Sequence, residues 1–321
     1  MNAPPSGRGN ILLAAGEGTE GVAVVASSLA GARVAVIGGD SRQLAVAEAL
    51  AAEGALVATH GLPSRPGVLR AVSTLREAIA EAAVVVLPIS GASSEGRVAT
   101  LPDQPPVRLD EEFWDNLPPS TLILAGSLPE EARRRIAEGG HRLVEYAEID
   151  EIAILNSIPT AEGALQLAME ALPITIHGAC VFILGFGRVG LTTARLFHAV
   201  GAETWVVADR PALLARAYEM GCRAVTFAGL AKEIHRADLV VNTVPARVLS
   251  AETIALTKPG VYIIDLASAP GGVDFQAAQS LGRRAVHALG LPGRVAPETA
   301  GRILSNTLPA IIAGELAKKE G

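Results

Sequence analysis

Aromatic side chains are scarce in this sequence: they make up 3% of its 321 residues, although half of all residues are hydrophobic. The cores must therefore be built from Ala, Val, Leu and Ile, a composition that suits buried parallel strands covered by helices. Cysteine is equally rare, and Cys180 and Cys222 lack the Cys-x-x-Cys or Cys/His spacing of a metal or redox site. We therefore expect two reduced thiols and no bound metal.

The sequence also lacks clusters of positive charge and long apolar runs. Its 27 Lys and Arg residues are scattered and the net charge is −6, so we expect neither nucleic acid nor an acidic membrane surface as a partner. No apolar run reaches the roughly 18 to 20 residues that cross a bilayer. Residues 1–30 contain apolar patches, but Glu17 and Glu20 interrupt them and Arg8 is their only basic residue, which fits a signal peptide poorly. We interpret this segment as a low-complexity extension of a cytoplasmic protein.

The most informative stretch runs from Cys180 to Asp209. An apolar strand leads into Gly185-Phe-Gly-Arg-Val-Gly190, an amphipathic helix follows, and a second apolar strand ends at the aspartate. This pattern is typical of a dinucleotide-binding βαβ unit. Its first glycine permits the tight turn, its second admits the pyrophosphate, and its third lets the helix pack on the strand. The N-terminus of the helix offers free N–H groups and a positive dipole end to the phosphates.

The chain follows one plan twice. Strands and helices alternate in the first half and again after Cys180, which predicts an α/β fold of two doubly wound, Rossmann-like domains with a cleft between them. Only the second half carries the glycine triplet. We therefore assign the dinucleotide to residues 151–297 and the substrate to residues 31–150. A terminal helix over residues 298–318 is expected to cross back to the first domain.

Cofactor contacts are expected at the carboxyl ends of the strands of the second domain, where ligands bind in such sheets. The candidate residues are Gly185, Phe186, Gly187, Arg188, Val189, Gly190, Asp209, Arg210, Asn242, Thr243, Val244, Pro245, Asp265 and Ser268. Asp209 can accept hydrogen bonds from a ribose diol, which favours NAD. Arg210 can pair with a 2′-phosphate, which favours NADP.

The segment between the two halves reads Asn156-Ser-Ile-Pro-Thr-Ala-Glu-Gly163 and leads into an expected helix from Ala161 to Leu172. Thr160 can serve as the N-cap of that helix, and Glu162 lies in its first turn, where the helix dipole favours a negative charge. A linker with helix caps and a functional hinge are both compatible with this pattern.

Five segments together resemble the A subunits of dipicolinate synthase. They are Gly38-Gly-Asp-x-Arg-Gln43, Pro159-Thr-Ala-Glu-Gly163, Ile176-His-Gly178, the glycine triplet, and Pro292-Gly-x-x-Ala-Pro-x-Thr-Ala-Gly301. The triplet is shared by many families, but its combination with the other four segments is much more specific. The resemblance covers residues 31–318, nearly the whole chain.

The resemblance implies an oxidoreductase that forms dipicolinate, pyridine-2,6-dicarboxylate, in the mother cell of a sporulating bacterium. A dihydrodipicolinate, or its hydroxy-tetrahydro precursor, would lose hydride to NADP, with NAD as the alternative, and become aromatic. The family works with a second subunit of dipicolinate synthase, the flavoprotein-like B subunit. It shows an arginine at the place of Asp209, so this chain departs from the family where the cofactor is chosen.

Two carboxylates on such a substrate require cationic forks and hydroxyl or backbone donors. The candidate substrate-binding residues are Asp40, Arg42, Gln43, Ser90, Gly91, Ser93, Ser94, Arg97 and Thr160. The candidate proton acceptors are Glu162, because it lies near the expected hinge, and a water held by Asn156 or Ser157. None of the six histidines lies in a motif that requires catalysis.

Two other interpretations remain open. A 2-hydroxyacid dehydrogenase needs an arginine after the strand that ends at Asp265 and a histidine before the last helix, but Asp265-Leu-Ala-Ser-Ala-Pro270 lacks the arginine and Leu291-Pro-Gly-Arg294 lacks the histidine. A non-catalytic partner would bind NAD(P) and support a flavoprotein-like subunit without turnover of its own. Turnover by the purified chain distinguishes an enzyme from a non-catalytic partner.

Overall fold

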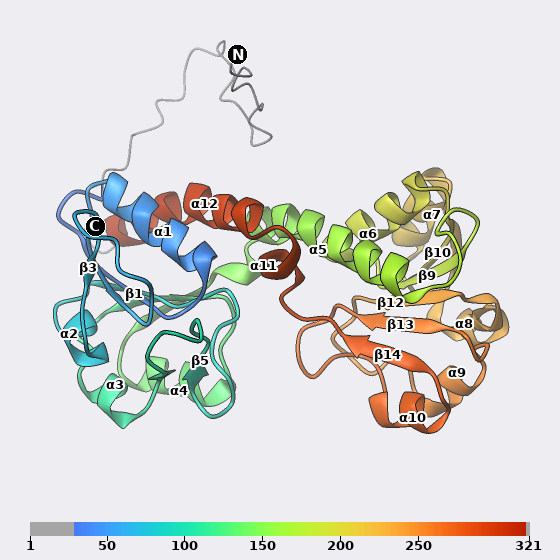
Figure 1. The fold of residues 1–321 in the computed structure, drawn as a ribbon, viewed down its shortest axis with the longest axis horizontal. Coiled ribbons are helices and arrows are strands. Elements are labelled where there is room, and N and C mark those ends of the chain that lie inside the picture. Colours follow the sequence, from blue (N-terminus) through green and yellow to red (C-terminus); the bar gives the residue numbers. More distant parts are fainter. Residues whose placement is uncertain (1–28, 319–321) are drawn as a thin grey trace, which may run out of the picture.

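The computed structural model describes residues 29–318, which form two α/β domains joined by two long helices (Figure 1). The expected extension lies outside the described residues except for its last two positions. Of these, Leu29 is 2% exposed and its N–H donates to the carbonyl oxygen of Glu53. The first core therefore begins slightly earlier than the sequence predicts.

The first domain is built on a six-stranded parallel sheet of order β3-β2-β1-β4-β7-β8. Its strands are β1 (Arg33–Ile37), β2 (Leu56–His60), β3 (Arg70–Ala71), β4 (Val84–Val86), β7 (Leu122–Ala125) and β8 (Arg142–Glu145). Its helices are α1 (Ser41–Ala52), α2 (Leu75–Ile79), α3 (Glu111–Asp115) and α4 (Glu130–Glu138). The central strands are continuous runs of Val, Ala, Leu and Ile because helices cover both faces of the sheet.

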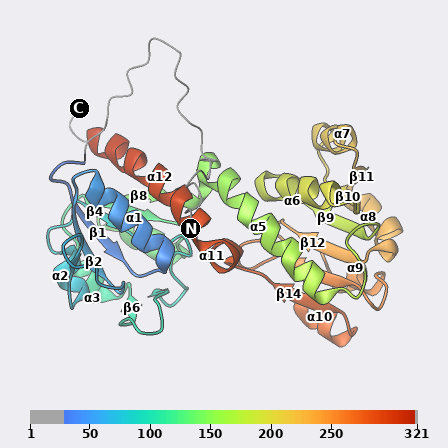
Figure 2. The ribbon, with the colours of Figure 1, turned by 45° about the horizontal axis from the view of Figure 1, so that its top comes forward.

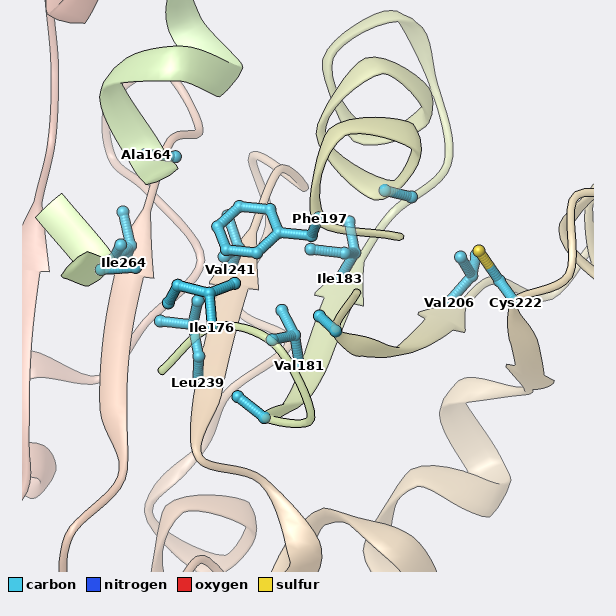
Figure 3. Packing of buried hydrophobic residues seen from close by; sticks show 14 of the residues in the cluster. Ala164, Ile176, Val181, Ile183, Phe197, Val206, Cys222, Leu239, Val241 and Ile264 are labelled. Atoms are coloured by element: carbon cyan, nitrogen blue, oxygen red, sulfur yellow. The ribbon is translucent and has the colours of Figure 1, made fainter. Parts of the chain in front are cut away.

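The second domain repeats this order as β11-β10-β9-β12-β13-β14. Its strands are β9 (Cys180–Leu184), β10 (Glu203–Val207), β11 (Arg223–Val225), β12 (Leu239–Asn242), β13 (Tyr262–Asp265) and β14 (Arg284–His287). Its helices are α6 (Arg188–Ala199), α7 (Pro211–Glu219), α8 (Phe227–Glu233), α9 (Ala251–Ala255) and α10 (Phe275–Ser280). Figure 3 shows Phe197 of α6 meeting aliphatic side chains of the central strands in one hydrophobic core. The predicted pair of doubly wound α/β domains is confirmed.

Three helices connect the domains: α5 (Asp150–Ala171), α11 (Leu291–Val295) and α12 (Pro297–Ala317). Figures 1 and 2 both show α12 lying beside α1, and its Leu304, Leu308 and Ile312 belong to the first core. The terminal helix thus crosses back to the first domain, as the sequence predicts. Among residues 29–318, no helix combines the length and hydropathy needed to cross a bilayer.

The expected linker before Ala161 is wrong, because α5 runs unbroken from Asp150 through Pro159. A proline inside a helix removes one hydrogen bond and costs about 3 kcal/mol. Burial on two domains offsets that loss, since Ile152 lies in the first core and Ala164 in the second. Consequently Thr160 is not an N-cap.

Removing the side chain of Leu308 should destabilise the first domain, because this residue of α12 is fully buried against α1. Leu308→Ala should lower the free energy of unfolding by about 2–5 kcal/mol. Urea unfolding followed by the fluorescence of Trp114, in a Trp205→Phe background, measures the change. The control is Leu281→Ala, because Leu281 is 38% exposed. Equal midpoints for the two variants would contradict the placement of α12.

Candidate dinucleotide and substrate site

The glycine triplet leaves the N-terminus of α6 accessible. Gly185 has a φ of +90°, and a Cβ atom on Gly190 would overlap the carbonyl oxygen of Gly185, so neither position accepts a side chain. Gly187 differs, because a Cβ atom there would meet nothing within 4 Å. It is the N-cap of α6 and no side chain caps the helix. The first backbone N–H groups of α6 therefore face open space, as pyrophosphate binding requires.

The large side chains beside these glycines turn away from that space. Phe186 is buried in the second core, and Val189 is half-buried. Arg188 reaches towards the first domain, where it pairs with Glu148 and Asp150. The loop thus offers a ligand its backbone rather than its side chains.

Asn242 and Asp265 brace the loops at the ends of β12 and β13. Both are fully buried, and Nδ2 of Asn242 donates to Oδ1 of Asp265 over 2.8 Å. The same amide bonds both backbone groups of Val244, while the carboxylate accepts the N–H groups of Ala267 and Gly272. These side chains were predicted as cofactor contacts, but their polar atoms already bond the protein. They position the loops that a cofactor would meet.

The remaining candidates at this edge differ in how far they are buried and in whether they bond the protein. Thr243 is half-buried, and its hydroxyl donates to the carbonyl oxygen of Leu184, which ties β12 to β9. Val244 is half-buried as well, whereas Pro245 and Ser268 are exposed. The exposed pair remains available to a ligand.

The two residues that the sequence predicts to distinguish NAD from NADP, Asp209 and Arg210, are both exposed after β10. Oδ1 of Asp209 accepts the N–H of Phe227 over 3.0 Å, which ties the carboxylate to the start of α8. Arg210 forms no ion pair with any of the described residues. Its guanidinium is therefore free to meet an anion.

The corresponding edge of the first sheet is filled by the protein itself. A hairpin of β5 (Arg97–Val98) and β6 (Val107–Arg108) follows β4. The N–H of Gly39 donates to the carbonyl oxygen of Ala99, and a Cβ atom on Gly38 would lie 2.8 Å from Val98. The space that Gly187 leaves open in the second domain is thus occupied in the first.

Gln43 supports this packing instead of facing a ligand. It is 1% exposed, and its Nε2 donates to the carbonyl oxygen of Val86 over 3.1 Å. The sequence places this residue at the substrate because it follows the turn after β1. In the structure its amide ties α1 to β4, so a direct substrate contact is no longer expected.

Arg42 and Asp40 form a partly buried ion pair at the same edge. Nε of Arg42 lies 2.9 and 3.1 Å from the two oxygens of Asp40, and Nη2 lies 2.8 Å from Oδ2. Burial raises the pKa of the Asp40 carboxyl, but the hydrogen bonds and charge of Arg42 outweigh it and hold the pKa below its ordinary value. The Arg42 side chain is only 11% exposed. Its Nη1 bonds none of the described residues and remains available to a ligand.

Two residues around this pair were not identified from the sequence as site residues. Gly293 of α11 lies against the guanidinium, since a Cβ atom there would be 2.7 Å from Cζ of Arg42. Tyr146 is fully buried and donates to the carbonyl oxygen of Leu87; burial raises the pKa of its hydroxyl. The Pro292-Gly293 dipeptide was a signal for the first, whereas nothing local marks the second.

The loop after β4 is not drawn into this cluster. Gly91 is buried with a φ of +66°, and Oγ of Ser93 accepts the N–H groups of Glu95 and Arg97. Arg97 pairs with Glu95 and is 68% exposed. Ser90 and Ser94 are exposed as well. No contact among residues 29–318 joins Arg97 to Arg42.

The two candidates on α5 lie near its middle. Thr160 donates to the carbonyl oxygen of Asn156 over 2.8 Å. Glu162 is exposed and has no partner among the described residues. Its neighbour Gly163 packs on α11, where a Cβ atom would lie 3.0 Å from Leu291. This stretch of α5 is thus close to the helix that contacts Arg42.

Two further observations limit where a ligand or a metal ion could bind. A cavity of about 610 Å³ is lined by Arg33, Ala55 and other residues at the amino ends of β1 and β2. Ligands of such sheets bind at the carboxyl ends, so we do not assign it to the site. Within residues 29–318, no three His, Cys, Asp or Glu side chains are grouped as a metal site would require.

Comparison with known proteins divides the chain as its two sheets do. Residues 33–147 match a family model described as the N-terminal domain of the A subunit of dipicolinate synthase. Residues 160–290 match the NAD-binding domain of D-isomer specific 2-hydroxyacid dehydrogenases. The second domain is therefore a dehydrogenase-type domain for a nicotinamide dinucleotide.

Similarity to individual proteins extends over nearly the whole chain. The dipicolinate synthase A subunit of Bacillus subtilis is 38% identical over 91% of this chain and 99% of its own length. The crystal structure of the A subunit from Bacillus halodurans is 37% identical, with a TM-score of 0.83 over 89% of this chain and 99% of that one. A transhydrogenase from Sinorhizobium meliloti, 17% identical with a TM-score of 0.64 over 88% of this chain and 94% of its own, shares the fold alone. This chain belongs to the family of dipicolinate synthase A subunits.

Proposed function

We propose that this chain is the oxidoreductase subunit that forms dipicolinate from dihydrodipicolinate or hydroxy-tetrahydrodipicolinate, with NADP as hydride acceptor. We further propose the flavoprotein-like B subunit as its partner and the mother cell of a sporulating bacterium as its place of action. One observation carries the proposal: the chain has an open phosphate-binding loop in one domain and an oriented arginine with free donors in the other. The family relationship supports both sites.

Arg42 is the proposed anchor for one substrate carboxylate. Asp40 holds one side of its guanidinium, which leaves Nη1 and the second hydrogen of Nη2 for a ligand. An arginine held in this way presents a fixed fork that matches a carboxylate. Because its side chain is only 11% exposed, little water competes for those donors.

Dihydrodipicolinate becomes dipicolinate by losing a hydride and a proton from its ring, and hydroxy-tetrahydrodipicolinate must in addition lose one molecule of water. A bound nicotinamide dinucleotide supplies the hydride acceptor, and aromatisation of the product supplies the driving force. The protein then has to hold the ring in place and accept the proton. Glu162 is the proposed proton acceptor because it is exposed, unpaired among the described residues and one residue from the contact between α5 and α11.

The availability of the Arg210 guanidinium to a ligand favours NADP over NAD. This exposed arginine has no protein partner among residues 29–318, whereas the neighbouring Asp209 is tied to Phe227. A free guanidinium can pair with a 2′-phosphate, and the hydrogen bond to Asp209 offsets part of the charge that would repel it.

The alternative of a 2-hydroxyacid dehydrogenase explains less. Its NAD-binding domain matches here, but the loop after β13 reads Leu266-Ala-Ser-Ala-Pro270 and offers no arginine for a substrate carboxylate. In addition, α11 begins Leu291-Pro-Gly without a histidine. The chemistry of that family needs both groups.

Dipicolinate formation tests the proposed function directly. The purified chain is mixed with NADP and freshly generated hydroxy-tetrahydrodipicolinate, with and without the B subunit, and the ultraviolet absorbance of dipicolinate is followed. Arg42→Gln should raise KM for the substrate at least tenfold, because it removes the carboxylate fork, while NADP binding stays unchanged.

Arg97→Gln serves as the control in this assay, because its exposed guanidinium pairs only with Glu95 among residues 29–318. Absence of product under every combination would refute the function. Unchanged turnover in Glu162→Gln would remove that residue as the proton acceptor, whatever the effect of Arg42→Gln.

Alanine at two glycines of the triplet should separate cofactor binding from stability. Gly187→Ala adds a methyl group to the open space before α6, so it should weaken NADPH binding at least tenfold and leave the melting temperature unchanged. Gly190→Ala overlaps the backbone at Gly185 and should lower the melting temperature by several degrees. Fluorescence titration and thermal unfolding measure the two effects. Similar losses of stability in both variants would argue against a phosphate site at Gly187.

Substitutions at Asp209 and Arg210, the two residues after β10, should shift the cofactor preference in opposite directions. Arg210→Gln removes the cation for the 2′-phosphate and should weaken NADPH binding about tenfold with little effect on NADH. Asp209→Asn should instead favour NADPH, because it removes a negative charge and an acceptor for the ribose diol. Dissociation constants for both nucleotides provide the measurement. Equal changes for NADH and NADPH in Arg210→Gln would contradict the assignment.

A further inference from the structure

Arg188 connects the dinucleotide loop to the first domain. It is the first residue of α6, directly after the open Gly187. Its Nη1 donates to the carbonyl oxygen of Glu148 and to Oδ1 of Asp150, over 2.9 and 3.1 Å, and its Nη2 donates to the Glu148 carboxylate over 3.0 Å. The bond to Glu148 raises the pKa of the guanidinium. One side chain of the cofactor loop thus binds three groups at the start of α5.

Helix α5, which begins at Asp150, is fixed against α6. The hydroxyl groups of Ser157 and Thr192 lie 2.7 Å apart, and both residues are buried. This contact lies one to two turns beyond the ion pairs along each helix. The carboxylates of Glu148 and Asp150 therefore cannot move far from the N-terminus of α6.

These carboxylates are in an unfavourable place for an anionic ligand. An acidic residue in the first turn of α5 stabilises that helix, which explains Asp150 locally. However, both carboxylates bind the side chain of a residue whose backbone N–H lies at the phosphate-binding end of α6. The two side chains are largely exposed, 74% for Glu148 and 81% for Asp150, and charges of like sign within a Debye length, about 8 Å at physiological ionic strength, still repel each other.

We propose that Arg188 is a positioning residue for the dinucleotide: its positive charge offsets part of the negative charge of Glu148 and Asp150, so that a pyrophosphate can approach the N-terminus of α6. The phosphates then bind the backbone N–H groups, and the guanidinium stays with the first domain. Binding of the dinucleotide is thereby coupled to the contact between the domains. This inference rests on the dinucleotide site of the proposed function, but not on the identity of the substrate.

The test measures NADPH affinity by fluorescence titration of the full chain. Arg188→Gln should weaken binding about tenfold at low ionic strength, because two carboxylates are left unpaired, and the loss should shrink as salt is added. Adding Glu148→Gln and Asp150→Asn to that variant should restore binding to within about threefold of wild type. Arg188→Lys should keep most of the affinity, because it retains the charge.

Three controls keep the outcomes separate. Arg134→Gln removes an exposed arginine that pairs with Glu131 in the first domain and should leave binding unchanged. Thermal unfolding shows whether Arg188→Gln is folded. If it is not, the double variant Glu148→Gln/Asp150→Asn provides the test, because with Arg188 intact it should bind NADPH at least as tightly as wild type.

Two results would overturn the inference alone: wild-type affinity in Arg188→Gln, or a loss that neutralising Glu148 and Asp150 does not reverse. The second result would mean that Arg188 binds the phosphates directly. A wild-type chain that binds neither NADPH nor NADH would overturn the proposed function as well, and the inference with it.

Discussion

The burial of one helix, α5, fixes how the two domains of this protein meet. Its first turn contributes Ile152 to the core of the first domain, and its second half contributes Ala164 and Ala168 to the core of the second. Small residues let its neighbours approach closely: Gly163 packs against Leu291 of α11. Since α11 also contacts Arg42, the position of the proposed substrate anchor depends on this helix. The first turn of α5 meets Arg188 of the cofactor loop, so both sites depend on the same element.

The two sheets show how one topology can serve different ligands. The strand order is the same in both, and glycines follow the first strand of each. In the first domain, Gly39 is enclosed by Gln43, Pro88 and the hairpin after β4. In the second domain, Gly187 faces open space. The space around the glycines, rather than their presence, therefore determines which sheet can hold a dinucleotide.

Most of the fold could be predicted from the sequence because the signals are local. Runs such as Val84–Val86 can only be strands buried on both faces, and the glycine triplet specifies strand, turn and helix together. The continuity of α5 could not be predicted. From the sequence, Pro159 predicts a break in the helix, because a proline removes a backbone hydrogen bond. The burial that compensates for this loss comes from two cores whose residues are distant in sequence.

The site was predictable only in part, for a related reason. Polar residues at the ends of parallel strands suit a ligand contact or a loop brace equally well, and the sequence does not distinguish them. Asn242 and Asp265 bond each other and three backbone segments, and Gln43 bonds β4. Unsatisfied polar groups in a buried position are costly, so such residues find protein partners wherever the backbone provides them. The partners are visible only once the strands are placed side by side.

The pair of Asp40 and Arg42 combines a contact within the protein with a proposed contact to a ligand. A partly buried ion pair contributes little net stability, because desolvation offsets much of the attraction. Its effect here is orientation: Asp40 takes one side of the guanidinium and Gly293 of α11 lies against it, which leaves a defined set of donors for a ligand. Because α11 leads from the second domain into α12, a shift between the domains would move Gly293 relative to Arg42. The arginine proposed to bind substrate therefore contacts both its own domain and the helix that leads out of the second domain.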